Sequence, residues 1–403
     1  MLKNHFLGAA LLVAGTAIGA GMLALPVTTA QYGLYPSITI FIVCWVLMTI
    51  AALLMLEVNL WLPEDTNLIS MARKTLGIPG AVLAWISYLL LLYALLSAYT
   101  TGLGSLSLDV MHASFGLNIP NWAGVLFFIV IGAGFIYAGT ESVDRINRIL
   151  LLGLFSTFML LIFALTPNIH YTQLTHAQFQ HIWLTLPVIF TTFGFQIIIP
   201  TIRSYLNSDV VPLRKAIIVG SVFPLATYII WQILILGVVP IAGEQGLNSI
   251  LQDGQPEVGL SHALAHILQI PWINIGFRCF ASFAIATSFL GVSLSLFDFL
   301  ADGLHVRKKI TGGRIINLIL TFTPPLFFAL IYPRGFILAL QYAGIFVAIL
   351  LVFMPAAMAW SGRYYLKLST AQHYRVFGGK WILAAVIVFA LITIWIDTLA
   401  RLV

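Results

Sequence analysis

Long apolar stretches follow one another along the chain and are separated by short polar connectors. A bilayer core of about 30 Å needs roughly 20 helical residues to cross it. The stretches therefore predict eleven transmembrane helices, at 6–31, 36–61, 80–105, 121–139, 149–166, 183–204, 215–240, 273–302, 314–332, 335–360 and 380–400. The longest connector, 241–272, is too short for a soluble domain, so we expect residues 1–403 to form a single transmembrane domain.

Composition supports a membrane location. Hydrophobic residues make up 61% of the chain and charged residues only 8%, against about 25% charged in soluble domains. Lys3 precedes the first apolar stretch as in a signal peptide. That stretch continues from Phe6 past Pro26, however, so we expect a retained helix.

The positive charges predict the orientation. With a cytoplasmic N-terminus, only Arg278, Arg334 and Arg401 of the 19 Lys and Arg residues fall on the outer side. Positive residues favour the cytoplasmic face, so we expect a cytoplasmic N-terminus and a periplasmic C-terminus. The basic excess is then an insertion signal, and a nucleic-acid partner is not indicated.

Motifs for catalysis are absent from the predicted helices. There is no H-E-x-x-H, no intramembrane histidine pair and no G-x-S-x-G, so an enzyme is not indicated. Rings of charge typical of a channel are also missing. His262 and His266 could share a helix face and bind a metal, but they have no evident third ligand, so solvated loop histidines are the preferred interpretation. Cys44 and Cys279 are interpreted as small buried residues without a disulfide.

Glycine and proline interrupt the first and sixth predicted helices. The first contains Gly15, Gly19 and Gly21 before Pro26, and the sixth contains Gly194 before Pro200. Interrupted helices in corresponding places of two halves are typical of inverted-repeat transporters with a midplane site. The alternative is that these glycines only allow close helix packing.

Such a site suits a zwitterion. Free N–H groups after Gly19 would face a carboxylate, and freed carbonyls would face an ammonium group. Tyr93, Phe190, Phe193 and Phe195 are candidates for an aromatic pocket beside the two breaks, although each is equally compatible with ordinary packing.

Among the carboxylates inside or at the ends of the predicted helices, we consider Glu57, Asp298 and Asp302. Intramembrane acids are candidates for a functional role, here as proton carriers. An ion pair is the alternative for Asp298 and Asp302, with Arg307 as one partner, and Glu57 could simply reach the interface.

Several segments resemble the aromatic amino acid permeases of bacteria, which include tyrosine and tryptophan permeases of the amino acid–polyamine–organocation superfamily. They are Gly15–Leu23, Phe193–Phe195, Ala286–Gly291, Leu296–Asp298, Tyr332–Phe336 and Tyr342–Gly344. The resemblance implies an all-α fold of the LeuT type in a bacterial inner membrane. Its two inverted five-helix repeats would span about 6–166 and 183–360, with broken helices 1 and 6 and an eleventh helix at 380–400.

The resemblance also implies site residues. A sodium ion, where one couples transport, would be held by Gly15, Ile18, Ala284, Thr287 and Ser288. The substrate carboxylate would lie against Ala20 and Gly21. The rest of the substrate site would be formed by Thr16, Ala17, Tyr93, Phe190, Thr191, Phe193, Phe195, Gln196, Ser288 and Val292.

Two departures from the family pattern bear on mechanism. Gln196-Ile197 replaces the usual His-Gly, and glutamine hydrogen-bonds a phenol or indole but does not titrate near neutral pH. The fifth helix also lacks the lysine of some proton-coupled relatives, which favours sodium, whereas family habit favours the proton.

We therefore expect a symporter that imports tyrosine, tryptophan or phenylalanine by alternating access, as a monomer and without a cofactor. A transporter of another neutral amino acid, branched or hydroxylated, is the alternative. A sensor that binds an amino acid without moving it is a more distant one.

Overall fold

The computed structural model describes residues 2–64, 66–116, 120–304, 311–368 and 374–400. Within these residues the chain is helical apart from turns, loops and a single isolated β-bridge between Gly33 and Ala177. The helices of the first part are α1 (Leu2–Ala17), α2 (Gly21–Thr29), α3 (Leu34–Leu60), α4 (Leu68–Phe115), α5 (Asn121–Ala138) and α6 (Thr140–Leu165). The short helix η1 (Ala30–Tyr32) follows α2.

The second part begins with η4 (Ile182–Thr185), α7 (Leu186–Thr192), η5 (Phe195–Ile198) and α8 (Ile199–Tyr205). It continues with α9 (Val210–Val238), α10 (Leu247–Asp253), α11 (Pro256–Leu268), α12 (Pro271–Gly303) and α13 (Thr311–Ile331). The last helices are α14 (Phe336–Val347), the π-helical turn η6 (Ala348–Phe353), α15 (Met354–Tyr364) and α16 (Gly379–Ala400).

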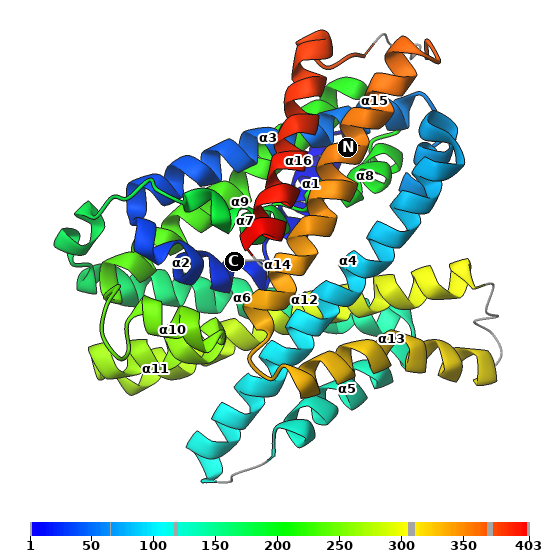
Figure 1. The fold of residues 1–403 in the computed structure, drawn as a ribbon. Coiled ribbons are helices and arrows are strands. Elements are labelled where there is room, and N and C mark those ends of the chain that lie inside the picture. The colour runs from blue at the N-terminus through cyan, green and yellow to red at the C-terminus, as the bar shows by residue number, and fades with distance from the viewer. Residues whose placement is uncertain (1, 65, 117–119, 305–310, 369–373, 401–403) are drawn as a thin grey trace.

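Ten helical segments in the described chain are long and apolar enough to cross a membrane, and the bent pair formed by α1 and α2 with η1 makes eleven. The predicted number of about eleven apolar helices is therefore confirmed. The longest helix, α4, begins at Leu68, well before the predicted residue 80, and is kinked at Gly77, where φ is +74°. The connector 241–272 contains two short helices, α10 and α11, which lie together at one end of the molecule (Figure 1).

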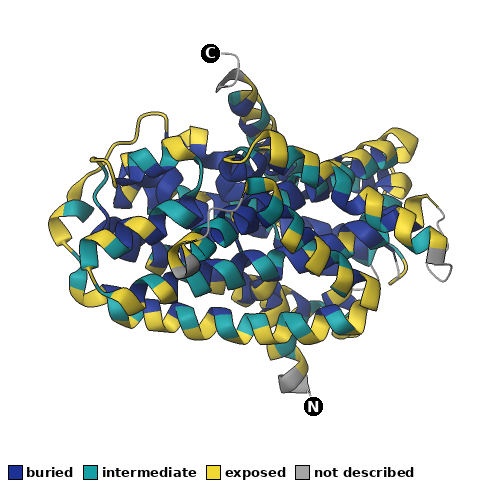
Figure 2. Cartoon of the chain, turned by 90° about the horizontal axis from the view of Figure 1, so that it is seen from below, coloured by how far each residue is buried: buried dark blue, intermediate teal, exposed yellow. Residues whose placement is uncertain are grey.

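The helices divide into a central and a peripheral set. In the apolar 18-residue stretches of Ile182–Tyr205 and Phe336–Tyr364, 67% and 61% of the residues are buried, against only 22% in that of Thr140–Asn168. Large apolar side chains such as Leu152 and Phe163 are exposed on the peripheral helices, and the buried residues gather in the middle of the bundle (Figure 2). An apolar exterior of this kind is stable in lipid.

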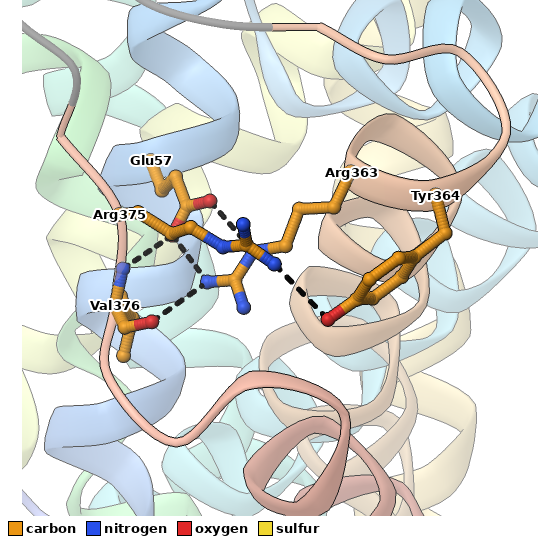
Figure 3. A network of polar contacts seen from close by, with 5 residues as sticks. All are labelled: Glu57, Arg363, Tyr364, Arg375 and Val376. Atoms are coloured by element: carbon orange, nitrogen blue, oxygen red, sulfur yellow. Dashed lines mark hydrogen bonds and ion pairs between the residues drawn. The ribbon is translucent and has the colours of Figure 1, made fainter.

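A buried ion pair joins α3 to α15 (Figure 3). Arg363 donates to both carboxylate oxygens of Glu57, at 2.7 and 2.5 Å, and the backbone N–H of Val376 donates to Glu57 Oε2 at 2.7 Å. Arg375 donates to the Tyr364 hydroxyl at 3.0 Å beside this pair. Glu57, whose side chain is 1% exposed, thus ties the segment before α16 to the bundle rather than reaching the interface.

The other two acids considered from the sequence lie near the end of α12. Asp298 is half-buried and Asp302 is exposed. Arg307, the ion-pair partner considered for them, lies outside the described residues.

Candidate substrate and ion site

A cavity of about 460 Å³ lies at the centre of the bundle. Its wall is formed by α1, α2 and the linker between them, and by α4, α6, α7, η5, α12, α14 and η6. Small-molecule pockets in proteins typically measure about 300–1,000 Å³, so a single amino acid fits its size. The backbone from Gly15 to Gly21 forms one side of the cavity.

The chain changes direction by 56° between α1 and α2. Ile18 makes the last α-helical hydrogen bond of α1, to Ala14 O at 3.0 Å. Within the described residues, no group accepts from the N–H of Gly19 or Gly21, and none donates to the carbonyls of Gly15 or Ile18. Free donors at a helix start and free acceptors at a helix end match the two charges of a zwitterion.

Close packing explains two glycines at this bend. A Cβ at Gly19 would lie 2.5 Å from Ser288 Oγ, and a Cβ at Gly21 would lie 2.8 Å from Thr192 Cγ2. The Ser288 hydroxyl accepts from the N–H of Ala20 at 3.1 Å. The linker thus lies directly against α12 on one side and α7 on the other.

The second interruption lies between α7 and α8. Phe193 and Gly194 leave the helical conformation, with ψ of 20° and 46°, before the short helix η5 begins. The hydroxyl of Tyr228 on α9 lies 2.7 Å from Ala17 O and 2.8 Å from Thr192 O. A fully buried tyrosine therefore bridges the last carbonyls of α1 and α7, and no sequence pattern singled it out.

Most of the small and polar residues predicted for the site line this cavity. They are Gly15, Thr16, Ala17, Ile18, Ala20, Gly21, Thr191, Thr287, Ser288 and Val292. Ala284 lies just behind the wall, and its carbonyl accepts from the hydroxyls of Thr287 and Ser288 at 3.1 and 3.0 Å. Four of the expected ion ligands, Gly15, Ile18, Thr287 and Ser288, thus line one cavity, and the fifth, Ala284, is hydrogen-bonded to the last two. Carbonyl and hydroxyl oxygens are hard donors that suit a cation such as sodium.

The predicted aromatic residues lie elsewhere. The Tyr93 hydroxyl donates to Leu320 O on α13 at 2.9 Å. Phe190 packs against Phe389 of α16, Phe193 packs against Tyr228, and Phe195 is fully buried in the core. These four side chains are absent from the described lining of the cavity.

Tyr88 and Tyr99 of α4 line the cavity instead, on one stripe with Leu91, Leu92 and Leu95. Residues spaced by three, four, seven and eleven positions share a helix face. Tyr93, five positions after Tyr88, is rotated away from that face. The helical spacing of residues along α4 is the sequence signal that distinguishes Tyr88 and Tyr99 from Tyr93.

Gln196 borders a second, smaller cavity of about 260 Å³. Tyr88 and Ile197 line both cavities. The two spaces are therefore neighbours separated by these side chains.

Polar contacts join α4 to α11 and to α12. The Ser105 hydroxyl donates to Glu257 Oε1 at 2.5 Å. One helical turn further along α4, Asp109 lies 2.6 Å from His262 Nε2 and 2.9 Å from Arg278 Nη2. Burial raises the pKa of the Glu257 carboxyl to about 7, and the hydrogen bond from Ser105 partly opposes this effect. Sequence reasoning missed Glu257 because it lies in a connector outside the predicted helices.

The metal site considered at His262 and His266 receives no support. No group of three or more His, Cys, Asp or Glu side chains among the described residues could hold a metal ion. His262 is instead held by Asp109. Cys44 and Cys279 are free thiols, the first buried and the second half-buried.

Comparisons with known proteins agree with this architecture. The chain is 37% identical over 391 residues to "Tyrosine-specific transport system 1" of Haemophilus influenzae, covering 96% of this chain and 95% of that protein. It is 35% identical over 405 residues to "Tyrosine-specific transport system 2" of the same organism, covering 100% and 98%. It is 32% identical over 400 residues to a "Tryptophan-specific transport protein" of that organism, covering 96% and 94%.

These relatives are named as transport proteins and not as enzymes, and their similarity extends along nearly the whole of each chain. The tryptophan/tyrosine permease family matches residues 2–397. The chain is thus a multi-span membrane protein and a member of the tryptophan/tyrosine permease family.

Proposed function

We propose that the chain imports an aromatic amino acid by cation-coupled symport with alternating access. The observation that carries this proposal is the meeting of two interrupted helices at one cavity. The N–H groups of Gly19 and Gly21 would bind the substrate carboxylate, and the carbonyls freed at the breaks would accept from its ammonium group. Tyr88 and Tyr99 would contact the ring.

Helix packing supports a LeuT-type arrangement of two inverted repeats. In such an arrangement each helix of the first repeat has a counterpart in the second. The counterparts would be α1–α2 and α7–α8, α3 and α9, α4 and α12, α5 and α13, and α6 and α14. The contact of α1 with α9 then matches that of α3 with α7 and α8, and the contact of α6 with α12 matches that of α14 with α4. The pairs α4–α5 and α12–α13 match in the same way. Helix α16 would be the additional eleventh helix.

The cavity is asymmetric, which supports an inward-facing state. Its wall extends to Leu11 on α1, Asn147 on α6 and Ser295 on α12, all on the α1 side of the break. On the other side every residue of α2 is buried, and α2 packs against α10 and α11. With a cytoplasmic N-terminus, the cavity would face the cytoplasm while α10 and α11 close the periplasmic side of a monomeric unit in the inner membrane.

The coupling cation would bind between α1 and α12. The carbonyls of Gly15 and Ile18 and the hydroxyls of Thr287 and Ser288 form a set of oxygens that favours sodium. A proton-coupled cycle is the alternative, and it would need a titratable carrier in place of this site.

Uptake into proteoliposomes tests the proposal. Labelled tyrosine and tryptophan are supplied under an imposed sodium gradient and, separately, under an imposed pH gradient. We expect concentrative uptake driven by sodium and lost in Ser288→Ala. Ser295→Ala is the matched control, because this serine lines the same cavity on the same helix but lies outside the ion site.

Uptake driven only by the pH gradient would identify the proton, and not sodium, as the coupling ion. The assignment of an aromatic substrate would still hold. Uptake of leucine or serine in preference to all aromatic amino acids would contradict the substrate assignment. Saturable binding without any uptake would contradict transport itself.

A further inference from the structure

Glu257 is a fully buried carboxyl in the contact between α11 and α4. Its Oε1 lies 2.5 Å from the Ser105 hydroxyl, and its Oε2 is inaccessible to solvent and has no hydrogen-bond partner among the described residues. A buried carboxylate needs several donors to offset the loss of water around its charge. This position therefore suits the neutral acid better than the ion.

The hydrogen bonds around Ser105 favour the same neutral form. Its hydroxyl, which has one proton to donate, also lies 3.1 Å from each of the carbonyl oxygens of Thr101 and Gly102. A protonated Glu257 donates to Ser105 Oγ, and Ser105 then donates to its own helix, so each proton has an acceptor. A carboxylate would instead compete with the two carbonyls for the single proton of Ser105.

The charges around Glu257 provide no partner for the ion. At this end of the helices packed against α11, α2 has no titratable side chain. Those on the other elements are Asp109 and His112 of α4, Arg278 and Cys279 of α12, Asp253 of α10 with its partner Arg334, and His262 and His266 of α11 itself. Asp109 engages both Arg278 and His262. Within the described residues, Glu257 forms no ion pair.

The burial of Glu257 depends on the position of α11. This helix packs against α2 and α4, and in the proposed alternating access these helices separate to admit substrate from the periplasm. Glu257 would then face water, where its pKa has the ordinary value of 4.5. In the structure burial raises the pKa to about 7, although hydrogen bonds from Ser105 and from its own backbone N–H oppose the effect.

We propose that Glu257 is a proton-binding site that links the closure of α11 over α2 to the pH of the periplasm. The carboxyl takes up one proton from the outer solution as the contact forms and returns it when the contact opens. A proton is the ligand that fits, because it arrives on the exposed side chain and is then buried with it. The site acts whether sodium or a proton couples transport, and it rests on the proposed alternating access.

The sign of the effect follows from linkage. The closed contact binds the proton more tightly than the open one, so acid favours closure. This advantage is complete below about pH 4.5 and is lost as the pH rises through about 7. One proton changes the ratio of open to closed protein by at most about tenfold per pH unit. We therefore expect a rise on the order of tenfold in the open fraction between pH 5.5 and 7.

Thiol labelling from the periplasmic side measures the open fraction. Thr28 on α2 is buried, so Thr28→Cys should react with a membrane-impermeant maleimide only when the outer side opens. The half-buried Cys279 is replaced by serine in all proteins to remove its thiol. Gln245→Cys, at an exposed position before α10, reports the intrinsic pH dependence of the thiol reaction. Labelling is followed in right-side-out membrane vesicles between pH 5.5 and 8.

Rates for Thr28→Cys are divided by those for Gln245→Cys. The normalised rate should rise on the order of tenfold from pH 5.5 to 7 and level off above that. Glu257→Gln is neutral at every pH, so in that background labelling should stay slow throughout. Ser105→Ala removes a hydrogen bond that stabilises the ion more than the acid, so the pH at which labelling levels off should rise.

Two kinds of failure are distinguishable. A normalised rate that is independent of pH, or the same pH dependence with and without Glu257→Gln, would overturn the proton site and leave alternating access in place. Complete protection of Thr28→Cys at every pH, while Gln245→Cys is labelled, would contradict the opening of the outer side. That result would overturn the proposed function and this assignment together.

Discussion

Glu257→Gln perturbs the contact between α11 and α4 without changing the size of the side chain. The wild-type carboxyl is fully buried and accepts from Ser105 at 2.5 Å, and its second oxygen has no partner within the described residues. Glutamine can still accept from Ser105 but carries no charge at any pH. The substitution therefore isolates the effect of ionising this group.

The sign and size of the effect follow from the pKa. Burial raises the pKa of Glu257 from 4.5 to about 7, so the folded protein binds this proton more tightly than the unfolded chain does. Below about pH 4.5 the group is neutral in both states and has no effect. Between pH 4.5 and 7 the carboxyl is ionised in the unfolded chain while it is still protonated in the fold. The fold is therefore destabilised increasingly as the pH rises, by an amount that reaches about 3 kcal/mol above pH 7.

Thermal unfolding of the purified protein between pH 5 and pH 8 measures this difference. We expect Glu257→Gln and the wild type to have similar stability near pH 5 and the variant to become progressively more stable toward pH 8. Asp109, His262 and Arg278 also face this contact, but they are unchanged in both proteins. Glu244→Gln, an exposed glutamate before α10, is the control. A stability difference that is independent of pH, or one reproduced by the control, would refute the reasoning.

Two further substitutions test the structural contacts around the site. Tyr228→Phe removes the hydroxyl shared by the ends of α1 and α7, so the free energy of unfolding should fall by about 1–3 kcal/mol. Tyrosine uptake should fall with it. Unchanged uptake would show that the bridge has no role in transport. Arg363→Met leaves Glu57 charged and unpaired, which should cost about 3–5 kcal/mol, and the added Glu57→Met should recover most of that loss in the same unfolding assay. Arg148→Met breaks an exposed pair with Asp144 and should change stability little. An equal loss of stability in both arginine variants would contradict the claim that burial makes the Glu57–Arg363 pair important.

The transmembrane helices could be predicted from the sequence because each needs about 20 apolar residues regardless of what surrounds it. The small residues of the cavity wall were also predictable, since Gly15–Gly21 and Thr287–Ser288 combine backbone freedom with oxygen donors in short segments. Such local signals do not depend on how the helices are rotated.

The aromatic lining could not be predicted in the same way. Helix rotation is set by packing against several neighbours, so Tyr93 faces α13 while Tyr88 and Tyr99 face the cavity. Glu257 and Tyr228 owe their importance to contacts with distant parts of the chain. A single carboxylate or tyrosine carries no local pattern that reveals such a partner.

The most direct test of the central claim is tyrosine binding to Gly15→Leu, measured by calorimetry on the purified protein. Gly15 lines the central cavity, and a Cβ there meets no atom within 4 Å, so the added side chain enters the space assigned to the substrate. Gly134→Leu is the matched control, because Gly134 is also helical and equally unobstructed but lies on α5, outside the cavity wall. Leucine favours helix over glycine at both positions.

Forced overlap in a packed site typically costs about 1–3 kcal/mol, or about five- to a hundredfold in affinity. The account predicts that Gly15→Leu weakens tyrosine binding by about fivefold or more. Gly134→Leu should bind tyrosine like the wild type. Unchanged tyrosine binding by a folded Gly15→Leu variant would contradict the placement of the substrate at the break between α1 and α2.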